Sequence, residues 1–203
     1  MDKPLTDQVA LITGAGQGVG QGIAYGLAKR GVRIIAVGRT LEKCEGTIAT
    51  IKERFGTDGA AIRCDIGVIA DLDDLVTSAA NQFGRLDILV NNAGWDLFVP
   101  FLDTQPDDWS RLIDINLVGA LNMHHAVLPA MVERGVGRVV NISSDAARVG
   151  SSGEAVYAAC TAGIVAFSKT MAREHSRNGI TFNVVCPGPT DTALLASVTD
   201  AAA

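Results

Sequence analysis

Six short runs rich in apolar and β-branched residues recur along the chain, and longer stretches with helical periodicity separate them. The runs cover residues 8–13, 32–37, 60–64, 86–91, 138–143 and 180–186. Most are apolar at odd and even positions alike, which is typical of parallel strands covered on both faces. The stretches between them predict helices over 18–30, 41–55, 69–83, 107–134 and 154–177.

This alternation predicts an α/β protein with a doubly wound parallel sheet, the Rossmann fold. No repeat, linker or low-complexity tract interrupts the sequence, so we expect a single domain over residues 1–203. Ligands of such sheets bind beyond the carboxyl ends of the strands, near the point where the strand order reverses. Residues that directly follow strands are therefore the candidates for function.

The composition is that of a globular domain, with 48% hydrophobic and 19% charged residues. The net charge of −5 argues against a nucleic-acid partner. No apolar run approaches the roughly 20 residues of a membrane span, and the N-terminus lacks a signal-peptide pattern, which favours a cytoplasmic location. Four scattered cysteines without zinc-site spacing predict reduced thiols and no metal.

A glycine-rich turn, TGAGQGVG, follows the first predicted strand and leads into the first predicted helix. Gly14, Gly18 and Gly20 have a GxxxGxG spacing, which lets the backbone turn tightly and a pyrophosphate approach the helix N-terminus. We expect this turn, including Gln17 and Val19, to bind a dinucleotide. A merely structural turn is the alternative.

The second predicted strand ends in VGRT, with Gly38 and Arg39 where an NAD-binding fold carries an acidic residue for the ribose hydroxyls. No acid is present there to repel a 2′-phosphate, and Arg39 could pair with that phosphate through charge-assisted hydrogen bonds. NADP is therefore the expected cofactor, with NAD as the alternative. A solvated surface arginine is the competing interpretation of Arg39.

The next two predicted strands end in residues suited to the same cofactor. Asp65, followed by Ile66, could accept a hydrogen bond from an adenine amino group. The NNAG sequence after the fourth strand contains Asn91, Ala93 and Gly94. Small residues there let a cofactor lie against the backbone, while the asparagines tie loop ends together.

Hydroxyl groups follow the last two predicted strands. Ser144 ends the fifth, and Tyr157 lies thirteen positions later on a predicted helix. The two could hold a carbonyl oxygen between them, with the tyrosine as proton donor. After the sixth strand, Thr190 and Thr192 are placed to bond a carboxamide; the Pro-Gly turn before them consists of Pro187 and Gly188.

Asn116 lies inside a predicted helix, an unfavourable place for a side chain that competes for backbone hydrogen bonds. A structural role explains it at least as well as a functional one.

Taken together, these residues resemble the short-chain dehydrogenase/reductase family over the whole chain. The shared marks are TGxxxGxG at 13–20, NNAG at 91–94, Asn116, Ser144, Tyr157 and PG at 187–188. The resemblance implies an NAD(P)-dependent enzyme that interconverts a secondary alcohol and a ketone. It also implies that Ser144 orients the carbonyl, that Tyr157 transfers the proton, and that Asn116 holds a helix kink and a water of the proton relay.

Residues 86–195 show a narrower resemblance, to 2-hydroxycyclohexanecarboxyl-CoA dehydrogenases, through NNAGWDLFVPF, SDAARVGSSGEAVYAAC and VVCPGPTDTALL. This implies a small apolar substrate that is alicyclic or a β-hydroxyacyl thioester. An apolar pocket could be lined by Trp95, Phe98, Val149 and Leu194, although ordinary packing explains each of them equally well.

Thr161 departs from the family pattern YxxxK, in which a lysine lies four residues after the tyrosine. Residues i and i+4 share a helix face, and the resemblance implies that this lysine binds the nicotinamide ribose and lowers the tyrosine pKa. We therefore expect cofactor to bind while turnover falls by about a thousandfold or more. Three explanations remain: an engineered substitution, a natural loss of catalysis, or a rearranged proton relay. A cofactor-binding sensor or partner without catalysis is the alternative function.

A substrate lid is expected to begin near residue 190. Family members continue for several dozen residues beyond this point, so we expect a truncated chain or a segment missing from the sequence, and a fold without the family's C-terminal strand. The predicted helices at 107–134 and 154–177 are apolar over much of their surface, which favours a homotetramer or homodimer.

Overall fold

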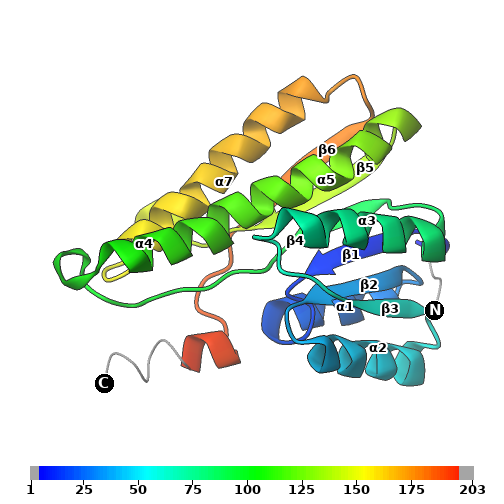
Figure 1. Cartoon of the computed structure of the whole chain (residues 1–203), viewed down its shortest axis with the longest axis horizontal. Helices are drawn as coiled ribbons and strands as arrows, with labels where there is room; N and C mark the ends of the chain where they lie inside the picture. The colour runs from blue at the N-terminus through cyan, green and yellow to red at the C-terminus, as the bar shows by residue number, and fades with distance from the viewer. Residues whose placement is uncertain (1–4, 197–203) are drawn as a thin grey trace.

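Six parallel strands form one sheet in the computed structural model, which describes residues 5–196. The strands are β1 (Val9–Thr13), β2 (Arg33–Gly38), β3 (Gly59–Arg63), β4 (Ile88–Asn91), β5 (Gly137–Ile142) and β6 (Ile180–Val185). Their order across the sheet is β3-β2-β1-β4-β5-β6, and every neighbouring pair is parallel (Figure 1). The predicted doubly wound sheet is confirmed, and its order reverses between β1 and β4.

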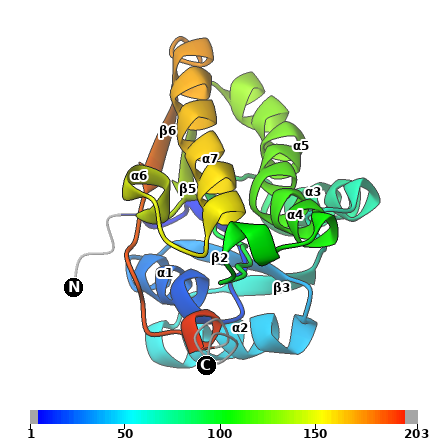
Figure 2. The same cartoon turned by 90° about the vertical axis from the view of Figure 1, so that its left-hand side faces the viewer.

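Helices cover both faces of the sheet (Figure 2). They are α1 (Gly18–Ala28), α2 (Leu41–Phe55), α3 (Ile69–Phe83), α4 (Pro106–Ile113), α5 (Gly119–Arg134), α6 (Ala146–Val149) and α7 (Ala155–Glu174), with short turns η1 (Phe101–Asp103) and η2 (Asp114–Val118). Ala10 and Ile12 of β1 pack in the core under α1 and α2. Val9 and Leu11 pack in the core under α3 and α5. Because side chains alternate along a strand, a strand covered on both faces must be apolar at both parities, as most of these strands are.

The helix expected over 107–134 is interrupted. α4 ends at Ile113, and the π-helical turn η2 precedes α5. Asn116 lies in that turn, and its Nδ2 donates to the Leu112 carbonyl oxygen at 2.9 Å and to the Trp95 carbonyl oxygen at 2.7 Å. A side chain bonded into the helical ladder in this way accompanies the widened turn. Helical periodicity does not predict η1 or α6, which are too short to show it.

Two helical stretches, Pro106–Arg134 and Ala155–Glu174, are long and apolar enough by length and composition to cross a membrane. Both are layers of this fold: α5 contributes to the core on the sheet, and α7 contacts β5 and β6. Apolar helices that cover a sheet can have the same length and composition as membrane spans, so the hydropathy of these two stretches does not argue for a membrane span. Only 22% of the apolar window of α7 is buried, so this helix also presents an apolar surface.

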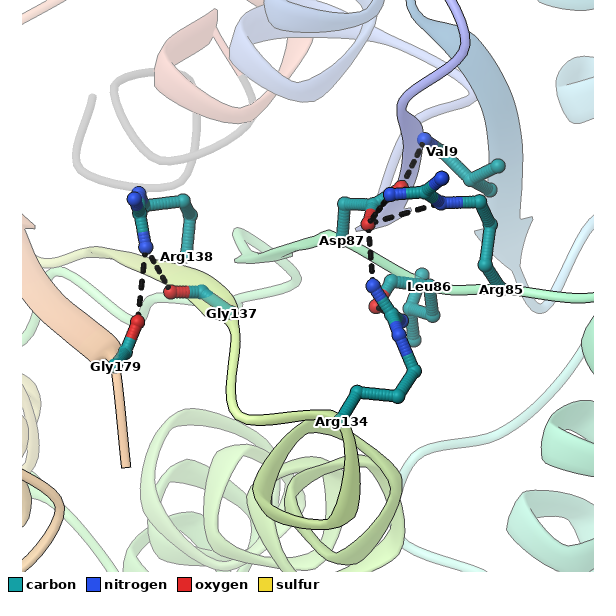
Figure 3. A network of polar contacts seen from close by, with 8 residues as sticks. All are labelled: Val9, Arg85, Leu86, Asp87, Arg134, Gly137, Arg138 and Gly179. Carbon is teal, nitrogen blue, oxygen red and sulfur yellow. Dashed lines mark hydrogen bonds and ion pairs between the residues drawn. The ribbon is translucent and has the colours of Figure 1, made fainter. Parts of the chain in front are cut away.

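The amino-terminal ends of the strands are joined by charged hydrogen bonds (Figure 3). Asp87, just before β4, accepts from the Val9 backbone N–H at 2.9 Å, from Arg85 Nη2 at 2.7 Å and from Arg134 Nη2 at 2.6 Å. Arg138 Nη1 donates to the carbonyl oxygens of Gly137 and Gly179 at 2.8 and 3.1 Å. These bonds fix the strands at the end of the sheet opposite to the candidate functional residues.

Candidate active site

β1 runs directly into the glycine-rich turn, where the backbone is left-handed at two positions. The φ angle is 68° at Gly14 and 56° at Gly18, a region that residues with a side chain rarely adopt. A Cβ atom on Gly20 would lie 2.4 Å from the Gly14 carbonyl oxygen, so the close approach of α1 to the turn requires glycine. The turn therefore presents bare backbone at the N-terminus of α1, an arrangement that favours phosphate.

The ends of β1 and β4 are tied together by Thr13 and Asn92. Thr13 Oγ1 accepts hydrogen bonds from the backbone N–H groups of Asn92 and Ala93 at 2.9 and 3.0 Å. Asn92 Nδ2 donates to the Thr13 carbonyl oxygen at 3.0 Å. These two strands border the position where the strand order reverses, so the bonds fix the floor of the ligand crevice.

Asn91, the last residue of β4, belongs to a buried polar cluster. Its Nδ2 donates to Asn141 Oδ1 at 3.0 Å and lies 3.3 Å from His124 Nδ1. Burial lowers the pKa of His124, although its contact with the Ala120 carbonyl oxygen opposes this, so the ring is held neutral. Asn91 Oδ1 is buried without a hydrogen-bond partner among the described residues. A polar group entering the crevice could satisfy that oxygen.

Two basic side chains flank the end of β2. Arg39 is exposed, and Lys43 lies four residues later in the first turn of α2. Lys43 Nζ donates to Gln17 Oε1 of the glycine turn at 2.6 Å. Sequence reasoning identified Arg39 but missed Lys43, although the four-residue spacing at the start of a predicted helix was a usable signal.

Asp65 follows β3 and forms a turn with its own neighbours. Its Oδ1 accepts from the Gly67 backbone N–H at 3.0 Å, and its backbone N–H donates to Asp71 Oδ2 at 2.9 Å. The carbonyl oxygen of Ile66 accepts from Asn122 Nδ2 at 3.1 Å, which connects this loop to α5. The turn holds the Asp65 carboxylate at the carboxyl edge of the sheet.

Asn116 positions the loop that follows β4. In addition to its two donated bonds, its Oδ1 accepts from the Trp95 backbone N–H at 3.1 Å. The π-helical turn is therefore fastened to both polar groups of the Trp95 backbone. The indole ring lies under the Arg111 guanidinium, 3.9 Å from its Cζ to the ring centroid, and not on the cavity wall. The expectation that Trp95 lines an apolar pocket is wrong, because Arg111 binds the ring elsewhere.

Ser144 and Tyr157 come together and share a hydrogen bond. Ser144 lies just beyond β5, where its Oγ also accepts from the Ala146 backbone N–H at 3.1 Å. Tyr157 lies in the first turn of α7. Burial and then the negative charge of Asp96 raise the pKa of Tyr157, the Ser144 hydrogen bond opposes them, and Glu154 adds to the increase. The tyrosine is therefore held as a neutral hydroxyl.

Thr161 lies one turn after Tyr157 and is 5% exposed. Its Oγ1 lies 2.9 Å from the Tyr157 carbonyl oxygen and 3.2 Å from the Ala158 carbonyl oxygen, so the hydroxyl is bonded to its own helix. Ser143 Oγ donates to the Thr161 carbonyl oxygen at 3.1 Å and fixes this part of α7 against β5. The position supplies no cation. Lys169, farther along α7, is exposed and lies off the cavity wall.

An acidic pair that sequence reasoning missed lies beside Tyr157. Asp96, in the loop after β4, shares a hydrogen bond with Glu154, which immediately precedes α7. Burial first, and then Glu154, raise the pKa of Asp96 to about 7, while the Leu97 backbone N–H opposes the change. No local motif marks either residue, because 58 positions separate them in the sequence.

One cavity of about 810 Å³ connects these groups. Nearly all residues expected at the site line it: Gly14, Gln17, Gly18, Val19, Arg39, Asp65, Ile66, Asn91, Ala93, Gly94, Asn116, Ser144, Tyr157, Thr161, Pro187, Gly188, Thr190 and Thr192. Gly20 is the exception, since it packs beneath the turn. Phe98, Val149 and Leu194, which were expected in an apolar pocket, also line the cavity.

The segment after β6 returns across the glycine turn. A Cβ atom on Gly18 would lie 3.4 Å from Thr192 Cγ2, so the two segments are in close contact. Thr190 Oγ1 donates to the Gly188 carbonyl oxygen at 3.0 Å, and Thr192 Oγ1 accepts from the Leu195 backbone N–H at 3.3 Å. A helical turn starts at residue 193. This segment covers one side of the cavity.

The parallel sheet, the glycine turn at its switch point and the hydroxyl pair beyond β5 define a dinucleotide-binding α/β protein. The family model for short chain dehydrogenase matches residues 8–203. The chain therefore belongs to the short-chain dehydrogenase family of oxidoreductases, as its motifs predicted.

Known relatives agree with this assignment. The chain is 35% identical over 185 residues to a 3-oxoacyl-[acyl-carrier-protein] reductase of Synechocystis sp., covering 91% of this chain and 74% of the relative. It is 34% identical to the corresponding FabG reductase of Escherichia coli, covering 95% of this chain and 78% of the relative.

Two solved structures are similar throughout. The actinorhodin polyketide ketoreductase with NADPH has a TM-score of 0.92 and 36% identity, with coverage of 96% of this chain and 75% of that chain. A xylitol dehydrogenase bound to NAD⁺ has a TM-score of 0.88 and 32% identity, covering 91% of this chain and 71% of that chain.

Proposed function

We propose that this protein is an NADP-linked oxidoreductase that interconverts a secondary alcohol and a ketone. The observation that carries the proposal is the hydrogen-bonded pair of Ser144 and Tyr157, which lies on the wall of the cavity that begins at the glycine turn. The pair can hold and protonate a carbonyl oxygen. The glycine turn can place a dinucleotide in the same cavity.

The residues present fit a phosphorylated dinucleotide. The left-handed glycines, Gly14 and Gly18, leave room for a pyrophosphate at the N-terminus of α1. On the same cavity wall, the buried Asn91 Oδ1 has no hydrogen-bond partner among residues 5–196. Arg39 and Lys43 would hold the 2′-phosphate of NADP. NAD is the alternative cofactor. When bound, the nicotinamide supplies the hydride for the carbonyl carbon.

The other cofactor contacts follow from the same cavity. We assign the adenine amino group to Asp65 and the nicotinamide carboxamide to Thr190 and Thr192, with a substrate lid beginning near residue 190. The glycine turn (Gln17, Val19) and the loops containing Ile66, Ala93, Gly94, Pro187 and Gly188 would complete the surface.

For the chemical step, Ser144 would orient the carbonyl oxygen and Tyr157 would donate a proton to it. Asn116 acts indirectly, because its side chain fixes the Trp95 backbone and the π-helical turn beside the cavity. In the reverse direction, ionised Tyr157 would accept the proton of an alcohol. The two directions of the reaction therefore need opposite protonation states of Tyr157, which must be neutral for ketone reduction and ionised for alcohol oxidation.

The substrate that best fits is apolar, either alicyclic or a β-oxoacyl or β-hydroxyacyl thioester. Phe98 and Val149 are 39% and 73% exposed on the cavity wall, and both would be covered by an apolar group. The relatives named as 3-oxoacyl-[acyl-carrier-protein] reductases support the thioester. The narrower resemblance over residues 86–195 supports the alicyclic form.

We also propose that Thr161 slows turnover. Its hydroxyl is bonded to its own helix, so it provides no charge to stabilise the ionised Tyr157. A cation within about 4–6 Å would lower the pKa of the tyrosine. Each unit of decrease raises the ionised population near neutral pH about tenfold, so a shift of about 3 units corresponds to roughly a thousandfold.

The substitution Thr161→Lys tests this proposal. We expect cofactor-linked turnover to rise by up to about a thousandfold, chiefly for alcohol oxidation, because a lysine there would stabilise the ionised tyrosine. Thr161→Met is the matched control, since it lengthens the side chain without adding charge. The double variant Thr161→Lys/Tyr157→Phe should abolish the gain. No gain in Thr161→Lys would show that Thr161 is not the limiting residue.

A cofactor-binding sensor or partner without catalysis is the second candidate, favoured by the same self-bonded Thr161. It predicts that NADPH binding, followed by fluorescence, is tight while ketones and acyl thioesters are not turned over even in Thr161→Lys. Turnover in that variant would eliminate it.

We further propose a cytoplasmic homotetramer or homodimer. The apolar surface that α7 presents supports an interface between copies, and the molecular mass in solution would test it.

A further inference from the structure

Three ionisable groups meet on one part of the cavity wall. Asp96 lies in the loop after β4, Glu154 immediately precedes α7, and Tyr157 lies one turn into that helix. The first two share a hydrogen bond, so one of the two carboxyl groups must carry a proton. The charges of both act on the tyrosine.

The local structure directs the two carboxyl groups toward each other. Glu154 is the N-cap residue of α7, but its side chain makes no capping hydrogen bond, so it remains available to Asp96. The Val99 backbone N–H donates to the Gly153 carbonyl oxygen at 2.9 Å, which joins the two loops. The Leu97 backbone N–H donates to Asp96 Oδ1 at 2.8 Å and fixes that carboxyl group.

The surrounding charges do not neutralise the pair. Asp145, after β5, also lines the cavity and is paired with Arg148 at 3.0 Å. Arg111 of α4 lies over the Trp95 ring. The basic residues on the cavity wall are Arg39, just after β2, and Lys43, at the start of α2. β1 separates β2 from β4 in the sheet. Asp65, beyond β3, adds a further negative charge at that side.

We propose that Asp96 and Glu154 are positioning residues that hold negative charge beside Tyr157 and oppose its ionisation, so that the site favours ketone reduction over alcohol oxidation near neutral pH. This inference rests on the proposed function and adds which direction of the reaction the site favours. Carbonyl reduction needs the neutral tyrosine as donor, and that form is fully populated. Alcohol oxidation needs the ionised tyrosine as base, and the negative charge of the neighbouring carboxyl pair opposes its formation.

The protons balance in the reductive direction. Tyr157 gives its proton to the carbonyl oxygen while the carbon receives the hydride, which leaves an alcohol and an ionised tyrosine. The proton shared by Asp96 and Glu154 can then return to the tyrosine. Solvent reprotonates the carboxyl pair, so the site regains its starting charge.

The two tyrosines of this chain permit a direct test without cofactor or substrate. In a Tyr25→Phe background, Tyr157 is the remaining tyrosine, and its ionisation can be followed by ultraviolet absorbance as pH rises. We expect its midpoint to fall in Asp96→Asn and in Glu154→Gln, and to fall furthest in the double variant. Each unit of decrease makes the ionised form about tenfold more populated at neutral pH.

Asp145→Asn is the matched control, because it removes a carboxylate from the same cavity and should leave the midpoint unchanged. Asp96→Asn should also raise the ratio of alcohol oxidation to ketone reduction near neutral pH. Unchanged or higher midpoints in both Asp96→Asn and Glu154→Gln would overturn the inference. Since the titration uses the free protein, absence of turnover would count against the proposed function and not against this result.

Discussion

β4 has an aspartate near each end, and the structure treats the two carboxyl groups in opposite ways. Asp87 precedes the strand and accepts hydrogen bonds from Arg85, Arg134 and a backbone N–H group. Burial alone would raise the pKa of Asp87, but these bonds outweigh it and hold the value below the ordinary one. Asp96 follows the strand and is bonded to another acid, Glu154. Burial and that partner raise its pKa to about 7.

The difference shows that the partners decide whether burial is offset, as at Asp87, or reinforced, as at Asp96. At the amino-terminal end the acid is paired with cations, which stabilises the fold (Figure 3). At the carboxyl-terminal end, Asp96 lies beside Tyr157, and no ion pair joins it to a cation among the described residues. Shifted pKa values without structural compensation are characteristic of functional sites.

Removing the paired acid should have the largest effect on stability. Asp87→Asn would leave Arg85 and Arg134 without their shared carboxylate. Because both arginines are partly exposed, we expect a loss smaller than the about 3–5 kcal/mol of a fully buried ion pair. We expect a corresponding fall in the free energy of unfolding, measured with urea at neutral pH. Because the network lies at the other end of the sheet, the affinity for NADPH should be unchanged wherever the variant is folded.

The pH dependence provides a second measure of this network. The folded-state pKa of Asp87 is lowered, so its contribution is present above the unfolded value of about 3.9 and is lost as pH falls through the folded value. Asp87→Asn should therefore differ least from the parent in acid. Asp58→Asn, which removes an exposed partner of Lys52, is the control and should have little effect. A small loss at Asp87 would disprove its role as an anchor.

The arginines at the two ends of the sheet also differ, because one is paired with a carboxylate and the other is exposed in the cavity. Cofactor binding should reveal this difference. Arg134 is bonded to Asp87, whereas Arg39 is exposed on the cavity wall with Lys43. We expect Arg39→Ala to weaken NADPH binding by roughly ten- to a hundredfold, since hydrogen bonds between charged groups contribute about 1.5–3 kcal/mol. NADH binding should change little. Fluorescence titration with both nucleotides measures this preference.

Lys43→Ala should weaken NADPH binding in the same direction. Lys52→Ala is the matched control, because Lys52 lies on the same helix but off the cavity wall. Equal losses for NADPH and NADH in Arg39→Ala would show that Arg39 does not bind the 2′-phosphate.

The local features of this site could be predicted from the sequence. The glycine turn is predictable because left-handed backbone and close packing select glycine at nearby positions, as at Gly14 and Gly18. Asn116 could be singled out because an asparagine is unfavourable inside a helix. Its side chain does bond into the helical ladder, although periodicity alone did not predict the π-helical turn.

The features that depend on distant contacts could not be predicted. Asp96 meets Glu154 only because the loops after β4 and before α7 are joined in the folded chain. Likewise, Asp87 accepts a hydrogen bond from Arg134, which lies 47 positions away in the sequence. The position of Trp95 in the sequence allowed either a place on the cavity wall or ordinary packing; in the structure its ring lies under Arg111 and not on the wall. In each case the partner, and therefore the charge or orientation, comes from another element.

The last comparison is the pH dependence of stability through Asp96. Its pKa is about 7 in the folded protein, against about 3.9 in the unfolded chain. Between these values the folded state retains a proton that the unfolded state has released, so this group favours folding below about pH 4 and loses that contribution as pH rises to about 7. Asp96→Asn should therefore become more stable relative to the parent over that range, which urea unfolding at pH 5 and pH 8 would show.

The sign of this change is what separates the two ends of β4. Asp87→Asn should lose more stability, relative to the parent, as pH rises from acid, whereas Asp96→Asn should gain. Glu154→Gln should change in the same direction as Asp96→Asn, because Glu154 is one of the causes that raise the pKa of Asp96. Asp145→Asn, which removes a half-exposed ion pair with Arg148, should show neither of these changes in stability with pH. If Asp96→Asn and the parent differed equally at pH 5 and pH 8, the Asp96 carboxyl group would not titrate between those pH values in the folded protein, and its contrast with Asp87 would fail.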